Sequence, residues 1–115
     1  MLAHVREIVE IAAFAELLQR EGDLRFSDEE RRYAASKSDP VRRLAARWAA
    51  KLAAAQALGG GVAPEDVEVV RGTGAPHLRL GPRAEARRRE IGVARVHVSL
   101  THGVGHAAAS VVLEA

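Results

Sequence analysis

One long and well-delimited helical segment constrains the fold of this chain more than any other feature. Asp39 is suited to an N-cap, Pro40 to the first helical turn, and Gly59 to the helix end. Between them, apolar residues repeat along one helical face, at Leu44, Trp48, Leu52, Ala55 and Leu58. We therefore expect the longest element of the chain to be a helix over residues 39–59.

Shorter elements are expected before and after this helix. Residues 2–8 are consistent with a short strand, and helical spacing follows it at Ile11, Phe14, Leu17 and Leu18. Ser27 and Glu30 form a capping-box pattern that predicts the start of a short helix. Beyond the long helix, residues 67–71 and 77–80 resemble the two strands of a hairpin around the turn-forming residues 72–74.

The C-terminal third predicts one more helix and two more strands. Residues 82–90 are typical of a short basic helix that Gly92 closes, and residues 96–100 alternate apolar and polar as in a half-buried strand. Residues 111–113 supply a last strand. The expected fold class is α+β, with helices packed on an antiparallel sheet.

The length of the chain favours a single domain over residues 1–115, because 115 residues are too few for two ordinary cores. Alanine is abundant and only four residues are aromatic, so the core is built from small side chains. Such a core is thin for a lone monomer, and oligomerisation is therefore plausible from composition alone.

Several classes of function lack support in the sequence. The formal net charge is only +2, so nucleic-acid binding is not indicated. We expect no membrane segment, because no apolar run approaches the roughly 18–20 residues that span a bilayer. Cysteine is absent, which excludes disulfides and thiolate chemistry and leaves the cytoplasm as the default location. The chain also has no G-x-S-x-G, phosphate-loop or H-E-x-x-H motif.

Two separated motifs carry a specific resemblance. Residues 47–51 read RWAAK and residues 57–59 read ALG, while residues 96–102 read VHVSLTH. These runs resemble the long-helix motif RFAAKEA with K-A-x-G and the C-terminal HVS-[IL]-[ST]-H strand of the holo-acyl-carrier-protein synthases. Smaller landmarks in the same order at Glu10, residues 26–30 and residues 74–76 extend the resemblance over nearly the whole chain.

The resemblance implies a 4′-phosphopantetheinyl transferase-like α+β protomer, commonly a homotrimer, with an active site between protomers. Members of that family move 4′-phosphopantetheine from coenzyme A to a serine of an apo acyl carrier protein. The reaction uses magnesium, which needs hard carboxylate oxygens at fixed positions. In the family, an aspartate of the first strand and a glutamate of the long helix supply them.

This chain departs from the family at the positions that hold the metal. The first-strand pattern G-x-D-[IL]-x-E-[IL] is replaced by VREIVEI at residues 5–11, so Glu7 stands in place of the aspartate. The long-helix glutamate is replaced by Leu52, which offers no oxygen. We expect magnesium binding to be weakened or lost, because one ligand is missing. Magnesium usually retains several waters and few protein ligands, so this loss weakens binding without strictly forbidding it.

Two further departures affect charge. Gln56 replaces a lysine one turn after the missing glutamate, which removes a positive charge that pairs with phosphate. Ala13 replaces an arginine that meets the acidic helix of the carrier protein in the family. Phosphate stabilisation and carrier docking are therefore both expected to be weaker.

The resemblance assigns candidate site residues. Glu7 is the candidate metal ligand, and Glu7 and Lys51 are the candidate catalytic residues. The candidate coenzyme A contacts are Arg47, Lys51, Gly59, Gly61, Pro76 and His102.

Several of these residues, and Leu52, also have a purely structural interpretation. Arg47 and Lys51 lie four apart, and such a basic ridge is usually a solvated helix face. His102 could be a hydrogen-bonded histidine at a strand end, and residues 59–61 could be only a helix stop followed by a turn. Leu52 belongs to the apolar stripe of the helix, which predicts that it faces the core or a neighbouring protomer.

Two other features remain open. His97 alternates with apolar strand residues, so a structural hydrogen bond and a cofactor-facing role are equally compatible with its position. The arginines at positions 83 and 87–89 form either a solvated helix face or a surface that attracts an acidic carrier protein or nucleotide phosphates.

Three functions remain in competition. The first is the family's transferase reaction, impaired in this chain by the substitutions. The second is a non-catalytic relative that keeps the trimer and binds coenzyme A or a carrier protein. The third is a repurposed pocket that acts on a carrier-bound or coenzyme A-bound intermediate in a biosynthetic pathway.

Overall fold

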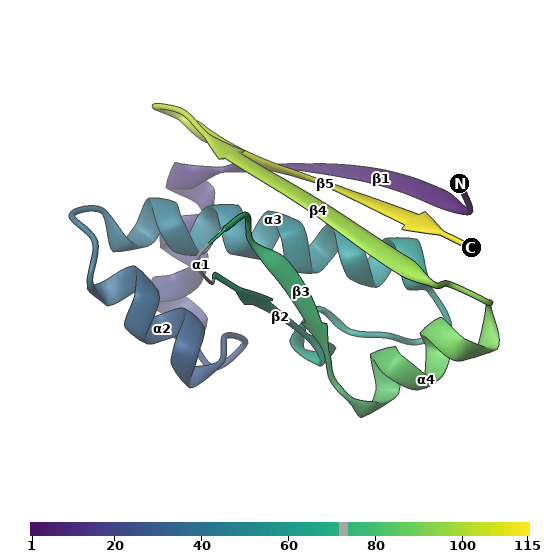
Figure 1. The fold of residues 1–115 in the computed structure, drawn as a ribbon. Coiled ribbons are helices and arrows are strands. Elements are labelled where there is room, and N and C mark those ends of the chain that lie inside the picture. Colours follow the sequence, from purple (N-terminus) through teal and green to yellow (C-terminus); the bar gives the residue numbers. More distant parts are fainter. Residues whose placement is uncertain (72–73) are drawn as a thin grey trace.

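The computed structural model describes residues 1–71 and 74–115. In this part of the chain the elements are β1 (Ala3–Glu10), α1 (Ile11–Glu21), α2 (Asp28–Ala35), α3 (Pro40–Leu58), a 3₁₀ turn (Pro64–Asp66), β2 (Val67–Val70), β3 (His77–Leu80), α4 (Pro82–Glu90), β4 (Arg95–His102) and β5 (His106–Glu114). The expected α+β class is confirmed, with helices on antiparallel strands (Figure 1).

The strands form two antiparallel ladders. The larger has three strands in the order β1-β5-β4, so the N-terminal strand pairs with the C-terminal one, and the smaller pairs β2 with β3. Helix α3 runs along one face of the three-stranded sheet, and the β2–β3 ladder lies beside it (Figure 1). This arrangement makes α3 the central element against which the other layers pack.

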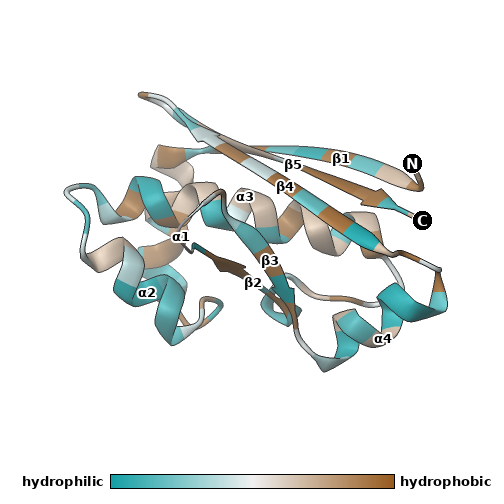
Figure 2. Cartoon of the chain, viewed as in Figure 1, coloured by the Kyte–Doolittle hydropathy of each residue, from teal (hydrophilic) through white to brown (hydrophobic). Residues whose placement is uncertain are grey.

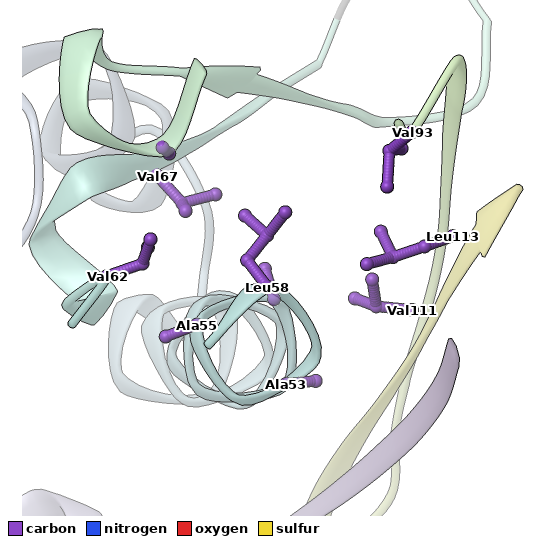
Figure 3. Packing of buried hydrophobic residues seen from close by; sticks show 10 residues of the cluster. Ala53, Ala55, Leu58, Val62, Val67, Val93, Val111 and Leu113 are labelled. Atoms are coloured by element: carbon purple, nitrogen blue, oxygen red, sulfur yellow. The ribbon is translucent and has the colours of Figure 1, made fainter. Parts of the chain in front are cut away.

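The core is built from small side chains on α3. Ala45, Ala49 and Ala53 are fully buried, which lets the helix backbone approach the sheet closely. At the C-terminal end of α3, Leu58 projects between Val67 of β2 and the β5 residues near Leu113 (Figure 3). Apolar residues are prominent on β2 and β5, whereas α2 and α4 are largely hydrophilic (Figure 2).

Strand β1 alternates in burial along its whole length. Val5 and Val9 pack against the buried clusters beside α3, while His4, Arg6 and Ile8 point to the opposite face and are exposed. In the part of the chain that the structure describes, no helix covers this opposite face of the sheet (Figure 1).

The helix starts follow from their caps. The Ser27 hydroxyl accepts a hydrogen bond from the Glu30 amide, and the Glu30 carboxylate accepts one from the Ser27 amide, as the capping box predicted. The Asp39 carboxylate likewise accepts from the Arg42 amide at the start of α3.

Several expected boundaries were wrong. The last strand was expected at residues 111–113 but extends over His106–Glu114, because the alanine run pairs with both neighbouring strands even though alanine has a low strand propensity. The first strand runs two residues beyond the expected 2–8, and β2 ends at Val70. The turn expected at 72–74 lies partly outside the described residues.

Candidate functional site

A small pocket of about 80 Å³ lies beside the middle of α3. It collects side chains from α2, α3 and the end of β4. Two more come from the first and last residues of the connection between β2 and β3. Its lining consists of Tyr33, Arg43, Ala46, Arg47, Arg71, Pro76, Leu100 and His102. Three of the expected coenzyme A contacts, Arg47, Pro76 and His102, are thus brought together although 55 positions separate the first from the last.

Arg47 is the buried charge of this pocket, with only 5% of its surface exposed. Its Cζ atom lies 4.0 Å from the centre of the Tyr33 ring, within the range of a cation–π contact. Its Nε atom is buried and has no hydrogen-bond partner among the described residues. Burial lowers the pKa of Arg47; Tyr33 and Glu30 oppose that shift and Arg71 adds to it. Because a guanidinium stays charged at neutral pH, the pocket contains a poorly solvated positive charge.

His102 lies at the mouth of the pocket and interacts with a second arginine. The distance from Arg43 Nη1 to His102 Nε2 is 3.2 Å. A guanidinium can only donate, so Nε2 must accept and the imidazole is neutral in this arrangement. Partial burial lowers the pKa of His102, and the positive charges of Arg43 and Arg42 lower it further. An anion between these groups would reverse that effect.

The charges of the pocket are unbalanced. Arg43, Arg47 and Arg71 line it together with His102, and no carboxylate side chain is among its described lining residues. Clustered guanidiniums present planar sets of N–H donors that match phosphate oxygens. The arrangement is therefore suited to binding a phosphate group.

Lys51 does not lie where the resemblance led us to expect it. It was expected to contact coenzyme A phosphate or, if the ridge is only structural, to be solvated. Instead its ammonium is buried, lying 2.8 Å from Glu30 Oε1 and 2.6 Å from the carbonyl oxygen of Val67. The expected exposed ridge is therefore wrong for Lys51, since α2 and β2 cover that face of α3, and Arg47 of the same ridge is buried as well.

Glu7 lies apart from the arginine pocket. It sits on the half-buried side of β1, in register with Ala109, which in turn pairs with Leu100 of β4. Two strand spacings, or about 9.5 Å, therefore separate the backbone of Glu7 from that of the pocket residue Leu100. The described residues of one protomer do not bring Glu7 and His102 together.

The residues at the positions that hold magnesium in the family do not fit a site of that type. Leu52 is half-buried and offers no oxygen, and Gln56 is exposed. No group of three or more histidine, aspartate or glutamate side chains that could hold a metal occurs among the described residues. Leu52 was expected to face the core or a neighbouring protomer. It is not among the apolar residues packed against the buried clusters, so the first alternative is wrong and the second stays a prediction.

The glycines at the end of α3 form a separate region. Gly59 and Gly61 have φ values of 65° and 82°, which side-chain-bearing residues rarely adopt. Arg87 Nε donates to the Leu58 carbonyl at 2.7 Å, and Arg83 reaches the Gly61 carbonyl at 3.4 Å. These glycines lie twelve or more residues beyond Arg47, roughly 18 Å along the helix, so they do not share its pocket.

Sequence reasoning missed three polar pocket residues: Tyr33, Arg43 and Arg71. Arg43 precedes Arg47 by one helical turn, and this spacing could have identified it. No sequence signal points to Tyr33 or Arg71.

His97, whose role the sequence left open, lies away from the pocket. Its Nε2 atom is 2.6 Å from Glu114 Oε1 on the exposed face of the sheet.

The described helices include none with the length and apolar character needed to cross a bilayer.

Comparison of the sequence with known proteins gives one consistent result. The chain is 53% identical over 92 residues to a holo-[acyl-carrier-protein] synthase of Anaeromyxobacter dehalogenans, covering 77% of this chain and 71% of the relative. It is 41% identical over 118 residues to a holo-[acyl-carrier-protein] synthase of Koribacter versatilis, covering 94% of each. No protein-family model matches the chain.

Solved structures agree with the sequence comparison. The holo-[acyl-carrier-protein] synthase of Neisseria meningitidis superposes with a TM-score of 0.88 at 26% identity, covering 100% of this chain and 99% of that one. A synthase of Chronobacterium ammoniagenes in complex with coenzyme A superposes with a TM-score of 0.79 at 30% identity, covering 97% and 96%. The chain therefore belongs to the holo-acyl-carrier-protein synthase family.

Proposed function

We propose that this chain binds coenzyme A and that its arginine pocket holds one of the phosphate groups. The observation that carries this proposal is the convergence of Arg43, Arg47 and Arg71 on a pocket that no described carboxylate side chain lines. The buried Nε of Arg47 and the neutral His102 are both suited to an incoming anion. A similar synthase solved in complex with coenzyme A supports the choice of ligand.

The proposed partner is an acyl carrier protein, and the proposed assembly is a homotrimer in the cytoplasm. Glu7 and His102 lie apart within one protomer, which is compatible with a site built from two copies. Gly59, Gly61 and the adjacent Arg83 and Arg87 then form a second proposed contact region for the cofactor.

The proposed reaction is the family's transfer of 4′-phosphopantetheine to a carrier serine, at a rate that is very low or zero. Leu52 removes one oxygen ligand and Gln56 removes one cation. Loss of one preorganised electrostatic group costs on the order of 2–4 kcal/mol of transition-state stabilisation. Two such losses together correspond to several orders of magnitude in rate.

An alternative follows from the same substitution. A half-buried leucine in place of a charged ligand also suits a chain that binds coenzyme A or carrier-bound intermediates of a biosynthetic pathway without transferring the group. Coenzyme A binding is common to both functions, whereas turnover distinguishes them.

The test combines binding with turnover. The protein is titrated with coenzyme A by calorimetry, and then incubated with coenzyme A, magnesium and an apo carrier protein, with intact-mass analysis of the carrier. We expect binding that falls when Arg47→Ala is used, and little or no mass gain in the carrier. An unaltered chain that does not bind coenzyme A would contradict the proposal, and rapid stoichiometric modification would contradict the impairment.

A further inference from the structure

The buried ion pair between Glu30 and Lys51 joins three elements beneath the arginine pocket. Both side chains are essentially inaccessible, with 0% and 2% of their surface exposed. Glu30 Oε1 accepts from Lys51 Nζ at 2.8 Å and from the Ser27 amide at 2.8 Å, and Oε2 accepts from the Val69 amide at 2.9 Å. The network thus links the start of α2, the middle of α3 and strand β2.

Each linked element carries or directly precedes a pocket residue that lies close to the network in the sequence. Tyr33 follows Glu30 by three positions on α2, and Arg47 precedes Lys51 by four positions on α3. Both spacings place two residues on the same helical face, about one turn apart. Arg71 follows Val69 by two positions and lies one residue beyond the end of β2. The orientation of all three pocket residues therefore depends on elements that this one ion pair connects.

Net stabilisation of the fold is a weak explanation for this buried ion pair. A buried ion pair can often be replaced by apolar side chains of similar volume with no loss of stability, because desolvation offsets the attraction. What such a network does well is to fix one geometry, because every member needs its partner in place. Glu30 also acts on the pocket directly, since its charge raises the pKa of Arg47.

We propose that Glu30 and Lys51 are positioning residues that hold Arg47 against Tyr33 and so preset the pocket for its phosphate. Neither side chain touches the ligand. The part of this inference that concerns ligand affinity rests on the proposed coenzyme A binding, whereas the part that concerns the Arg47 side chain does not.

The test measures the Arg47 side chain and ligand affinity separately. The double variant Glu30→Met with Lys51→Met removes the pair without leaving one buried charge, and Glu30→Asp withdraws the carboxylate while keeping its charge. The Arg47 Nε–H resonance, assigned with Arg47→Lys, reports the position of the guanidinium beside the Tyr33 ring. Coenzyme A affinity is measured by calorimetry.

We expect the Arg47 resonance to move toward that of an exposed arginine in both variants. We expect coenzyme A to bind at least about tenfold more weakly to the double variant and a few-fold more weakly to Glu30→Asp, as displaced charge-assisted contacts would produce. Val111→Ala, a fully buried β5 residue in the cluster at the far end of α3, is the control. It should lower the melting temperature while leaving the Arg47 resonance and the affinity unchanged.

The possible failures are distinguishable. If the unaltered protein does not bind coenzyme A, the proposed function fails, and the Arg47 resonance still tests the positioning. If the double variant does not fold, Glu30→Asp decides. An unmoved Arg47 resonance in the folded variants, or a shift of the same size in Val111→Ala, would overturn the inference.

Discussion

Leu52 and Gln56 are the two residues whose chemistry departs furthest from what phosphoryl transfer needs, and both are accessible enough to be changed. Leu52 is half-buried outside the apolar clusters and Gln56 is exposed, one helical turn later. We expect Leu52→Glu with Gln56→Lys to remain folded, to bind magnesium in the presence of coenzyme A, and to gain roughly 10²–10³-fold in transfer rate. Calorimetry with magnesium and intact-mass analysis of the carrier measure the two effects.

The matched control for that variant is Leu52→Gln with Gln56→Lys, which has the same shape but no carboxylate. It should fold equally well and show no magnesium binding. Suppose that Leu52→Glu with Gln56→Lys folds and binds coenzyme A but, like this control, shows no magnesium binding and no gain in transfer rate. The pocket has then diverged beyond these two positions, and the repurposed function is favoured over the impaired transferase.

His102 gives coenzyme A binding a pH dependence of predictable sign. In the free protein, burial and then Arg43 and Arg42 lower the pKa of His102, whereas a bound phosphate raises it. The complex therefore takes up a proton, so binding should strengthen as the pH falls from about 7 to about 5.5, relative to His102→Asn. Calorimetry on both proteins removes the titration of coenzyme A itself, which is common to them. If the difference in coenzyme A affinity between the two proteins does not change with pH, His102 does not face the anion.

The residue scale also shows where sequence reasoning stops. The grouping of Arg47, Pro76 and His102 could be expected from the two family motifs and the landmark at residues 74–76, and one pocket does contain all three. The burial of Arg47 could not be expected, because two basic residues four positions apart on a helix usually mark a solvated face, and neither could the burial of Lys51. Its partner Glu30 lies on another helix, and only the packing of α2 and β2 onto α3 brings the charges together.

At the scale of elements, the end of α3 depends on one glycine more than on its neighbours. A Cβ atom at Gly60 would lie 2.5 Å from Arg87 Nε, whereas a Cβ at Gly61 meets nothing within 4 Å, and both have positive φ. We expect Gly60→Ala to destabilise the fold by about 1 kcal/mol more than Gly61→Ala, because Arg87 must release its hydrogen bond to Leu58. Denaturant unfolding measures the difference.

A second variant checks the cause of that difference. In the Arg87→Ala background, Gly60→Ala and Gly61→Ala should lower the free energy of unfolding by the same amount. The contact between a Cβ at position 60 and Arg87 is then absent, and so is the hydrogen bond from Arg87 to Leu58. If the difference in stability between the two substitutions persists in that background, the strain lies in the backbone that follows α3 and not in its contact with α4.

Elements with local signals were predicted well, and elements defined by pairing were not. The caps at Ser27 and Asp39 predicted the starts of α2 and α3, and the structure confirms both. The alanine run at 107–109 carries no strand signal of its own. It is a strand because β1 and β4 pair with it on both sides, and such long-range pairing is not encoded in a local pattern.

At the scale of the whole molecule, the uncovered face of the three-stranded sheet is the feature that favours assembly. Ile8 lies on this face with 70% of its surface exposed, beside the small residues Ala108 and Ser110 of the central strand. We expect a stable trimer in solution, with a mass near three times 12.3 kDa by light scattering, because the alanine-rich core is thin for a lone protomer.

The substitution Ile8→Arg tests which face assembles. It should produce a folded monomer, since the side chain is exposed in one protomer, and it should weaken coenzyme A binding if the site needs two copies. The control is Leu24→Arg, at an 83% exposed residue in the loop after α1. A stable monomer of the unaltered chain at micromolar concentration, or an unchanged trimer with Ile8→Arg, would contradict this arrangement.

The buried pair of Glu30 and Lys51 also determines how this chain can evolve. Loss of either partner alone leaves an uncompensated charge in the interior, which costs about 3–5 kcal/mol, a large part of the stability of a small domain. Glu30 and Lys51 can therefore be substituted only together. This epistasis between the two positions conserves the elements that support the pocket. Leu52 and Gln56 have no such partner among the described residues, and a lineage can replace them one at a time. Descendants of this chain can thus change positions 52 and 56 by single steps while the residues beneath the arginine pocket stay the same.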